Sequence, residues 1–132
     1  MCERGVNMKN IDEKNKEIEE TKKKLSKHLN LIDESKKSVA QYLIAEIAFM
    51  SCILQELKLS ILTNGLTDEY QNGANQSGIK QSANLQAYNS TAKTYNTIFK
   101  QFIELFDKTA QKALSHDDEF MQFMAKSKSI KK

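Results

Sequence analysis

The sequence predicts an all-α protein, and three observations support this fold class. The 132-residue chain contains no Pro and only four Gly, so it holds few residues that interrupt a helix. Apolar residues recur at spacings of three and four over two long segments, which is the helical period. The segment between them is rich in Gly, Asn, Gln and Ser, a composition typical of turns. Together they predict one helical domain built on a hairpin of two long helices.

The chain divides into three parts by pattern. Residues 1–10 show no periodicity and are predicted to form a disordered tail. Residues 11–114 are predicted to form a helical domain, and residues 115–132 an amphipathic tail.

The first helix of the domain is expected to dock only lightly. This segment is dense in Glu and Lys, and its apolar residues Ile11, Ile18 and Leu25 recur every seven positions. One apolar residue per heptad gives a stripe narrower than a coiled-coil seam, so little surface is available for packing.

A stronger second helix is predicted after Asp33, a suitable N-cap, and Asn64-Gly65 is predicted to end it. Its main apolar positions are Val39, Leu43, Ile47, Met50, Leu54, Leu57 and Ile61. Further apolar residues on its other faces are Tyr42, Ile44, Phe49 and Ile53. Because one neighbouring helix covers one face only, we expect a second copy of the chain to cover another.

A third helix is predicted from its N-cap Ser82 to about Leu114. Its apolar stripe comprises Leu85, Tyr88, Ala92, Tyr95, Phe99, Phe102 and Phe106. Beyond it, the acidic residues 117–119 predict the start of a short tail helix. The connector between the second and third helices contains Asn72-Gly73, a frequent hairpin turn. Its flanks lack alternating apolar residues, so an irregular loop is favoured over a β-hairpin.

No arrangement of residues predicts catalysis. Residues 73–82 resemble a phosphate-binding P-loop, but Ile79 stands where that motif requires Lys. The two His residues lie in charged segments away from Cys2 and Cys52, and two thiols are too few for a disulfide framework. Adjacent acidic residues on a helix diverge instead of converging on a metal. The sequence therefore predicts no enzyme, cofactor, metal or small-molecule substrate.

No signal peptide and no apolar stretch approaching the roughly 20 residues of a membrane span are recognised, which predicts a cytoplasmic protein without membrane contact.

Two groups of lysines are candidates for contact with a polyanion. The net charge is +3 and both ends of the chain are basic. Near the N-terminus stand Lys22, Lys23, Lys24 and Lys27, although preceding Glu residues weaken their field. In the third helix a Tyr-Asn-Lys pattern repeats after seven residues, and it forms a ridge of Gln86, Asn89, Lys93, Asn96 and Lys100 without a carboxylate. Such a ridge suits nucleic-acid phosphates, and the alternative is a solvated flank of a core helix.

The run EYQNGANQSGIKQSANLQAYNSTAKTYNTIFKQFIELF, Glu69–Phe106, resembles phage terminase small subunits of the P27 type. The preceding IAEIAFM and NGL fit the same pattern, so the resemblance covers about half of the chain. The Tyr-Gln-Asn-Gly, Asn-Gln-x-Gly and doubled Tyr-Asn elements occur in the same order and at the same spacing. The chain departs from the family at Asn84, where a Pro is common nearby, and at Leu105-Phe106-Asp107, where the family has Leu-Leu-Pro.

The resemblance implies a helical, ring-forming, non-enzymatic protein that binds viral double-stranded DNA and presents it to the terminase large subunit, which holds the ATPase and nuclease. The candidate DNA-binding residues are Lys22, Lys23, Lys24, Lys27, Lys93 and Lys100. The candidate ring contacts are Ile47, Leu54, Tyr70, Asn72, Gln76, Tyr88, Tyr95 and Phe99. The candidate docking site for the large subunit is Phe120, Phe123 and Met124, unless that tail packs back on its own ring. A helical assembly adaptor or scaffold that does not bind DNA is the alternative.

Overall fold

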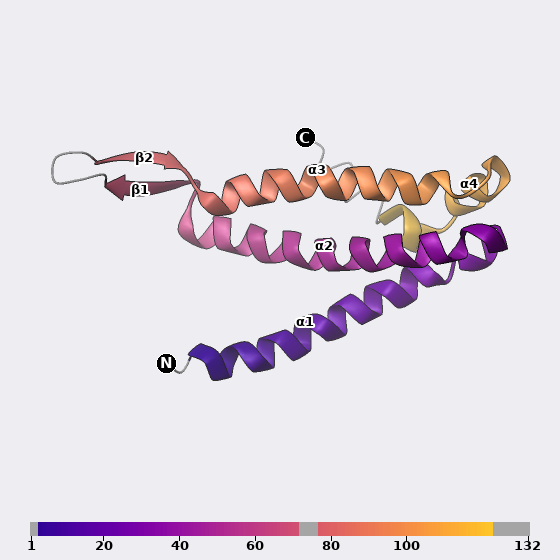
Figure 1. Cartoon of the computed structure of the whole chain (residues 1–132), viewed down its shortest axis with the longest axis horizontal. Coiled ribbons are helices and arrows are strands. Elements are labelled where there is room, and N and C mark those ends of the chain that lie inside the picture. The colour runs from indigo at the N-terminus through magenta and orange to yellow at the C-terminus, as the bar shows by residue number, and fades with distance from the viewer. Residues whose placement is uncertain (1–2, 72–76, 123–132) are drawn as a thin grey trace.

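The chain folds as a predominantly helical protein in which two long antiparallel helices form the body (Figure 1). The computed structural model describes residues 3–71 and 77–122. Its elements in chain order are α1 (Glu3–Ser26), the 3-10 turns η1 (Leu29–Leu31) and η2 (Glu34–Lys36), α2 (Lys37–Asn64), β1 (Thr67–Gln71), β2 (Ser77–Gln81), α3 (Ala83–Glu104) and α4 (Lys108–Leu114). Residues 118–122 are also helical. The predicted hairpin of two long helices is confirmed.

The ends of the two long helices follow the capping signals in the sequence. The Asp33 carboxylate caps the η2 turn by accepting hydrogen bonds from the Ser35 hydroxyl and backbone N–H. These hydrogen bonds lower the pKa of Asp33. The η2 turn runs directly into α2. Gly65 ends α2 with φ 90°, a conformation that favours Gly, and its N–H donates to the Ile61 carbonyl. The Ser82 hydroxyl accepts from the N–H groups of Asn84 and Leu85 at the start of α3.

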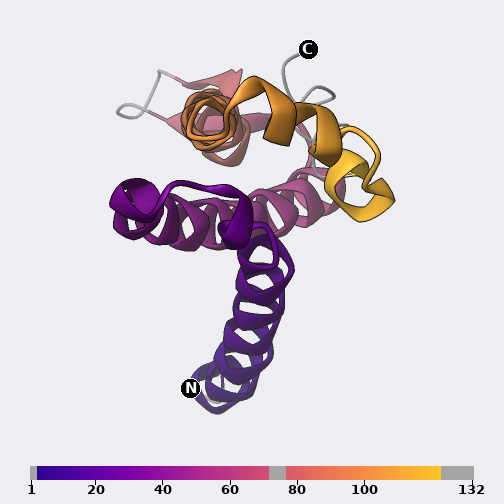
Figure 2. The same cartoon turned by 90° about the vertical axis from the view of Figure 1, so that its right-hand side faces the viewer.

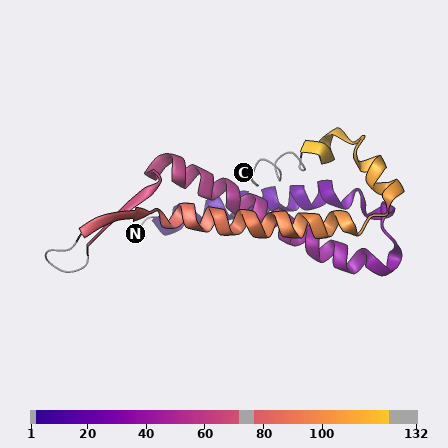
Figure 3. The ribbon, with the colours of Figure 1, turned by 90° about the horizontal axis from the view of Figure 1, so that it is seen from above.

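The core lies between α2 and α3, which run side by side (Figures 1 and 3). Buried residues at three-four spacing on each helix face one another across this contact, as expected for packed amphipathic helices. From α2 these are Leu43, Ile47, Met50 and Leu54, and from α3 Ala92, Tyr95, Phe99 and Phe102. Burial of these side chains stabilises the hairpin through the hydrophobic effect.

Helix α1 packs on α2 through its C-terminal half. Leu25 is fully buried, Ile18 is half-buried, and Ile11 is 51% exposed. Lys14 and Glu56 still form an ion pair with a distance of 2.9 Å between Nζ and Oε1. Toward its N-terminus α1 separates from α2 (Figures 1 and 2). The helix begins at Glu3, before the predicted boundary at residue 11. Because the apolar stripe of α1 is narrow, only the C-terminal half of this helix packs closely on α2.

The connector between α2 and α3 is a β-hairpin, so the predicted irregular loop was wrong. Strands β1 and β2 pair antiparallel from Thr67 with Gln81 to Gln71 with Ser77, and the hairpin projects beyond the helical body (Figure 1). The Ser82 N–H donates to the Leu66 carbonyl at its base. Because the hairpin lies outside the core, its strands need no alternating apolar face, and the expected sequence signal is absent.

The third helix ends earlier than the predicted boundary at Leu114. Helix α3 stops at Glu104, and Asp107 begins α4 by accepting a hydrogen bond of 2.7 Å from the Ala110 N–H. The Gln111 side chain donates to the Phe106 carbonyl across the break. Phe106, Ala110 and Leu114 are all buried and continue the apolar spacing, so the pattern alone does not reveal the break.

Segment Glu34–Asn64 contains an 18-residue window with mean hydropathy 1.4, which makes this helix long and apolar enough to cross a membrane. The expectation that the sequence holds no such stretch was wrong. The window is 50% buried inside the protein. A partly buried core helix passes the same test by length and composition.

Candidate nucleic-acid interface

The solvent side of α3 carries the ridge of amides and lysines that the sequence predicted. The apolar stripe of α3 turns toward α2, which leaves Gln86, Asn89, Lys93 and Lys100 exposed, while Asn96 is half-buried. Lys93 and Lys100 are seven residues apart, so they stand about two turns, or roughly 10.5 Å, apart along one side of the helix. Packing of the opposite face therefore determines their orientation.

The ridge is electropositive along most of α3, whose one acidic residue, Glu104, stands at the C-terminal end of the helix, one turn after Lys100. From Ala83 to Ile103, α3 contains Lys93 and Lys100 and no Asp or Glu. Among the side chains that the structure describes, no carboxylate lies within ion-pair distance of either lysine Nζ. An ammonium group without a protein counter-ion is free to donate hydrogen bonds to a phosphate oxygen. This arrangement suits contact with a sugar-phosphate backbone.

The N-terminal lysines are in a different electrostatic setting. Lys22 pairs with Glu19 at 3.4 Å, and both Lys24 and Lys27 approach Glu119, at 3.8 and 3.6 Å. Lys23 is exposed. Carboxylates thus offset much of the positive charge of this group, in part through a tail residue distant in sequence. On the α3 ridge, by contrast, neither Lys93 nor Lys100 forms an ion pair with a described side chain.

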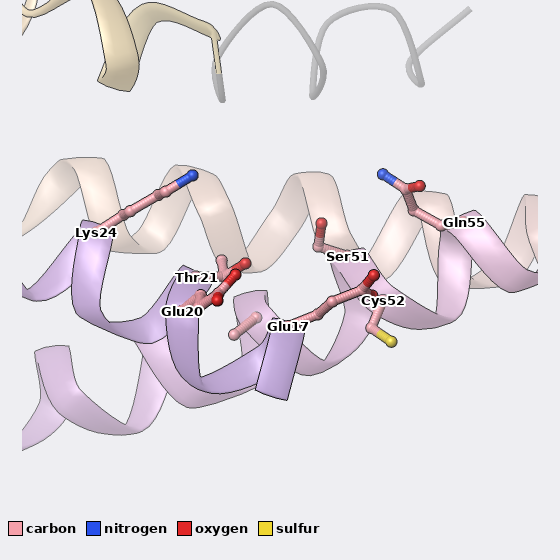
Figure 4. Close-up of a pocket in the computed structure, with 8 residues that line it drawn as sticks. Glu17, Glu20, Thr21, Lys24, Ser51, Cys52 and Gln55 are labelled. Carbon is pink, nitrogen blue, oxygen red and sulfur yellow. The ribbon is translucent and has the colours of Figure 1, made fainter. Parts of the chain in front are cut away.

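A polar cleft of about 150 Å³ lies between α1 and α2 (Figure 4). It is lined by Glu17, Glu20, Thr21, Lys24, Ala48, Ser51, Cys52 and Gln55. Burial, followed by the nearby carboxylate of Glu17, raises the pKa of the Cys52 thiol, so the thiol stays protonated and is a poor nucleophile. Among the residues that the structure describes, no group of three or more His, Cys, Asp or Glu side chains forms a metal site. The cleft holds no catalytic constellation.

Most of the predicted ring contacts lie inside a single chain. Ile47, Leu54, Tyr95 and Phe99 are buried between α2 and α3, and Tyr88 is partly buried against the same core. The first four are therefore unavailable to a neighbouring subunit. Their apolar spacing was read correctly as a packing surface, but α2 and α3 of the same chain cover one another.

The remaining predicted ring contacts belong to the hairpin. Tyr70 lies in β1, where its backbone pairs with Gly78. Asn72 and Gln76 fall outside the described residues, so no contact of theirs enters the site.

The predicted docking tail is partly built into the core. Phe120 is 1% exposed and contacts the rings of His28 and Phe99, with centroid distances of 5.2 and 6.0 Å. The alternative, that this tail packs back on its own protein, holds for Phe120. Phe123 and Met124 lie outside the described residues.

Sequence reasoning missed which apolar residues remain exposed. The exposed set includes Val39, Tyr42, Phe49, Leu59, Leu62, Leu66 and Ile79. Val39 was assigned to the core stripe of α2, whereas it is 51% exposed. Tyr42 and Phe49 had already been placed on another face of α2. The three-four spacing of positions 39, 42, 46 and 49 was the signal that could have placed Val39, Tyr42 and Phe49 on one exposed face of α2.

Comparison with protein-family models, with curated proteins and with solved structures finds no match to this chain.

Proposed function

We propose that this protein is the small subunit of a tailed-phage terminase. In this role it binds viral double-stranded DNA in the host cytoplasm, assembles as a homo-oligomeric ring, and delivers the DNA to the large subunit, which packages the genome. The resemblance of Glu69–Phe106 to the P27-type subunits supports this proposal. The observation that carries it is the exposed pair Lys93 and Lys100 on α3, within that same run, neither of which forms an ion pair with a described side chain.

The proposed mechanism is contact with phosphates and not with bases. Two lysines roughly 10.5 Å apart, flanked by Gln and Asn side chains, can donate hydrogen bonds to successive backbone positions. Neither lysine is held in a fixed fork of the kind that reads guanine, so binding is expected to depend weakly on sequence. A ring repeats the ridge once in each subunit. Modest affinity per subunit then becomes strong binding through multivalency.

The test is the salt dependence of DNA binding. Lys93→Gln/Lys100→Gln removes two phosphate contacts per subunit, so the slope of log K against log[salt] should become shallower by about 0.9 for each lost contact. The measurement is a fluorescence titration of duplex DNA over a series of salt concentrations.

The matched control is Lys24→Gln/Lys27→Gln, which removes two lysines that already approach Glu119. The control should change the slope less than the ridge variant. A larger effect of the control would place the DNA interface on α1.

A second function is favoured by a separate observation, the exposed apolar side chains of α2. These suit a helical assembly adaptor or scaffold that makes protein contacts only. Absence of DNA binding even at low salt would favour this alternative over the terminase role.

A further inference from the structure

Helix α2 carries an exposed apolar surface along one side, which we call the outer face. It consists of Val39, Tyr42, Phe49 and Ile53, with Glu46 among them at the same three-four spacing. Tyr42 is 63% exposed and Phe49 is 51% exposed. Aromatic side chains without a partner and a low density of charge are typical of the centre of a protein interface.

The outer face contains a groove. Phe49, Met50 and Ile53 of α2 and Ser90, Thr91 and Thr94 of α3 line this shallow, open groove of about 240 Å³. This volume is below the range of roughly 300–1,000 Å³ that is usual for small-molecule sites. It is suited instead to the insertion of an apolar side chain from a protein partner.

A second apolar surface, the distal patch, consists of Lys58, Leu59 and Leu62 near the C-terminal end of α2. Leu59 is 62% and Leu62 is 82% exposed. Toward its N-terminus, α1 separates from α2 (Figure 1). At 100° per residue, these two leucines lie on a different side of α2 from the outer face. The chain therefore presents two separate apolar surfaces on one helix.

The two surfaces are complementary in charge. Glu46 is the only charged residue from Ser38 to Gln55, and Lys58 stands one turn from Leu62 in the distal patch. Within the described parts of the chain neither Glu46 nor Lys58 forms an ion pair. Pairing of two outer faces would bring two Glu46 carboxylates into one apolar contact without a counter-charge. Contact of an outer face with a distal patch supplies Lys58 as the counter-charge of Glu46.

We propose that the outer face of one copy of this chain binds the distal patch of a second copy, with a leucine in the groove and Lys58 beside Glu46. In a pair of copies, one copy keeps its distal patch free and the other keeps its outer face free. The contact is therefore head-to-tail and repeats from copy to copy. Closure into a ring rests on the proposed function, whereas the contact itself does not.

The test uses one variant for each surface. Phe49→Asp disables the outer face and Leu62→Asp disables the distal patch, so each variant alone should be monomeric by light scattering. In an equimolar mixture, the Phe49→Asp chain supplies an intact distal patch and the Leu62→Asp chain an intact outer face. The mixture should form a 1:1 dimer of twice the 15.1 kDa chain mass. It should grow no further, because the two remaining surfaces are disabled. Circular dichroism checks that each variant is folded.

A charge exchange provides a second test of the same contact and leaves the apolar side chains unchanged. Glu46→Lys or Lys58→Glu alone creates a like-charge contact and should weaken assembly by at least about tenfold. The double variant Glu46→Lys/Lys58→Glu should recover it.

Three outcomes would overturn the proposal: a monomeric wild-type chain, no dimer in the mixture of variants, or no recovery in the double variant. All readouts are molecular masses, so failure of the contact is distinct from failure of DNA binding, which the salt series measures.

Discussion

Tyr95 brings a polar hydroxyl into the apolar core. Its ring is fully buried beside Phe99, with a centroid distance of 5.8 Å. Its hydroxyl is buried and has no hydrogen-bond partner among the described residues. Burial raises the pKa of Tyr95 to about 12. The doubled Tyr-Asn pattern predicted that Tyr95 lies on the packing stripe, but a pattern of residue types does not show whether a hydroxyl finds a partner.

Removal of this hydroxyl should therefore not destabilise the protein. Tyr95→Phe eliminates an unsatisfied buried group, so the free energy of unfolding should stay unchanged or rise by about 1 kcal/mol. Wild-type stability should also fall between about pH 10 and 12, because the unfolded state loses the tyrosine proton before the folded state does. Urea titrations at pH 7 and pH 11 measure both effects. A loss of more than about 1 kcal/mol at pH 7 would mean that the hydroxyl has a partner.

At the scale of elements, the start of α3 depends on one side chain. Ser82 is 2% exposed, and its hydroxyl accepts from the N–H groups of Asn84 at 3.1 Å and Leu85 at 3.4 Å. These N–H groups have no acceptor within the helix itself. The cap also fixes the point at which the hairpin passes into the helix that carries Lys93 and Lys100.

Ser82→Ala should lower the free energy of unfolding by about 1 kcal/mol, because it leaves these donors without the side-chain acceptor. The control is Ser90→Ala, at an exposed position inside the same helix, which should be neutral or slightly stabilising because Ala is the better helix former. Thermal unfolding followed by circular dichroism compares the two. Equal effects of the two substitutions would show that the cap contributes little.

The helices could be predicted from sequence because their signals are local. Caps such as Ser82 and Gly65 and the apolar spacing of α2 and α3 act within a few residues. The break at Asp107 was missed because Phe106 and Ala110 keep the helical spacing across it. The hairpin was missed because it lies away from the core, where alternation is not required. Sequence thus predicts elements that bury a face better than elements that project into solvent.

At the scale of the whole molecule, the C-terminal end of α1 and the segment after α4 meet at one corner (Figure 1). Phe120 packs on His28, and Asp117 Oδ2 lies 3.7 Å from His28 Nε2. Glu119 approaches Lys24 and Lys27 on the same side. This corner bears on two predictions, since it brings Glu119 close to two of the N-terminal lysines and buries the candidate docking residue Phe120. Contacts between residues about ninety positions apart leave no local signal in the sequence.

Phe120 should therefore be a stability residue and not a docking residue. Because its ring is 1% exposed and contacts both His28 and Phe99, Phe120→Ala should cost about 3–5 kcal/mol in the free energy of unfolding. The neighbouring Met121, which is 36% exposed, provides the control: Met121→Ala should change stability by less than about 1 kcal/mol. Urea denaturation measures both variants.

The same substitution should also loosen α1, because Phe120 joins the segment after α4 to the corner where α1 ends. Limited proteolysis should cut Phe120→Ala faster than wild type in both α1 and residues 115–122, since both segments lose the same contact. If Phe120→Ala were as stable and as protease-resistant as Met121→Ala, the corner would contribute nothing to the fold. Phe120 would then be free to leave the core, and its role in docking a partner would regain support.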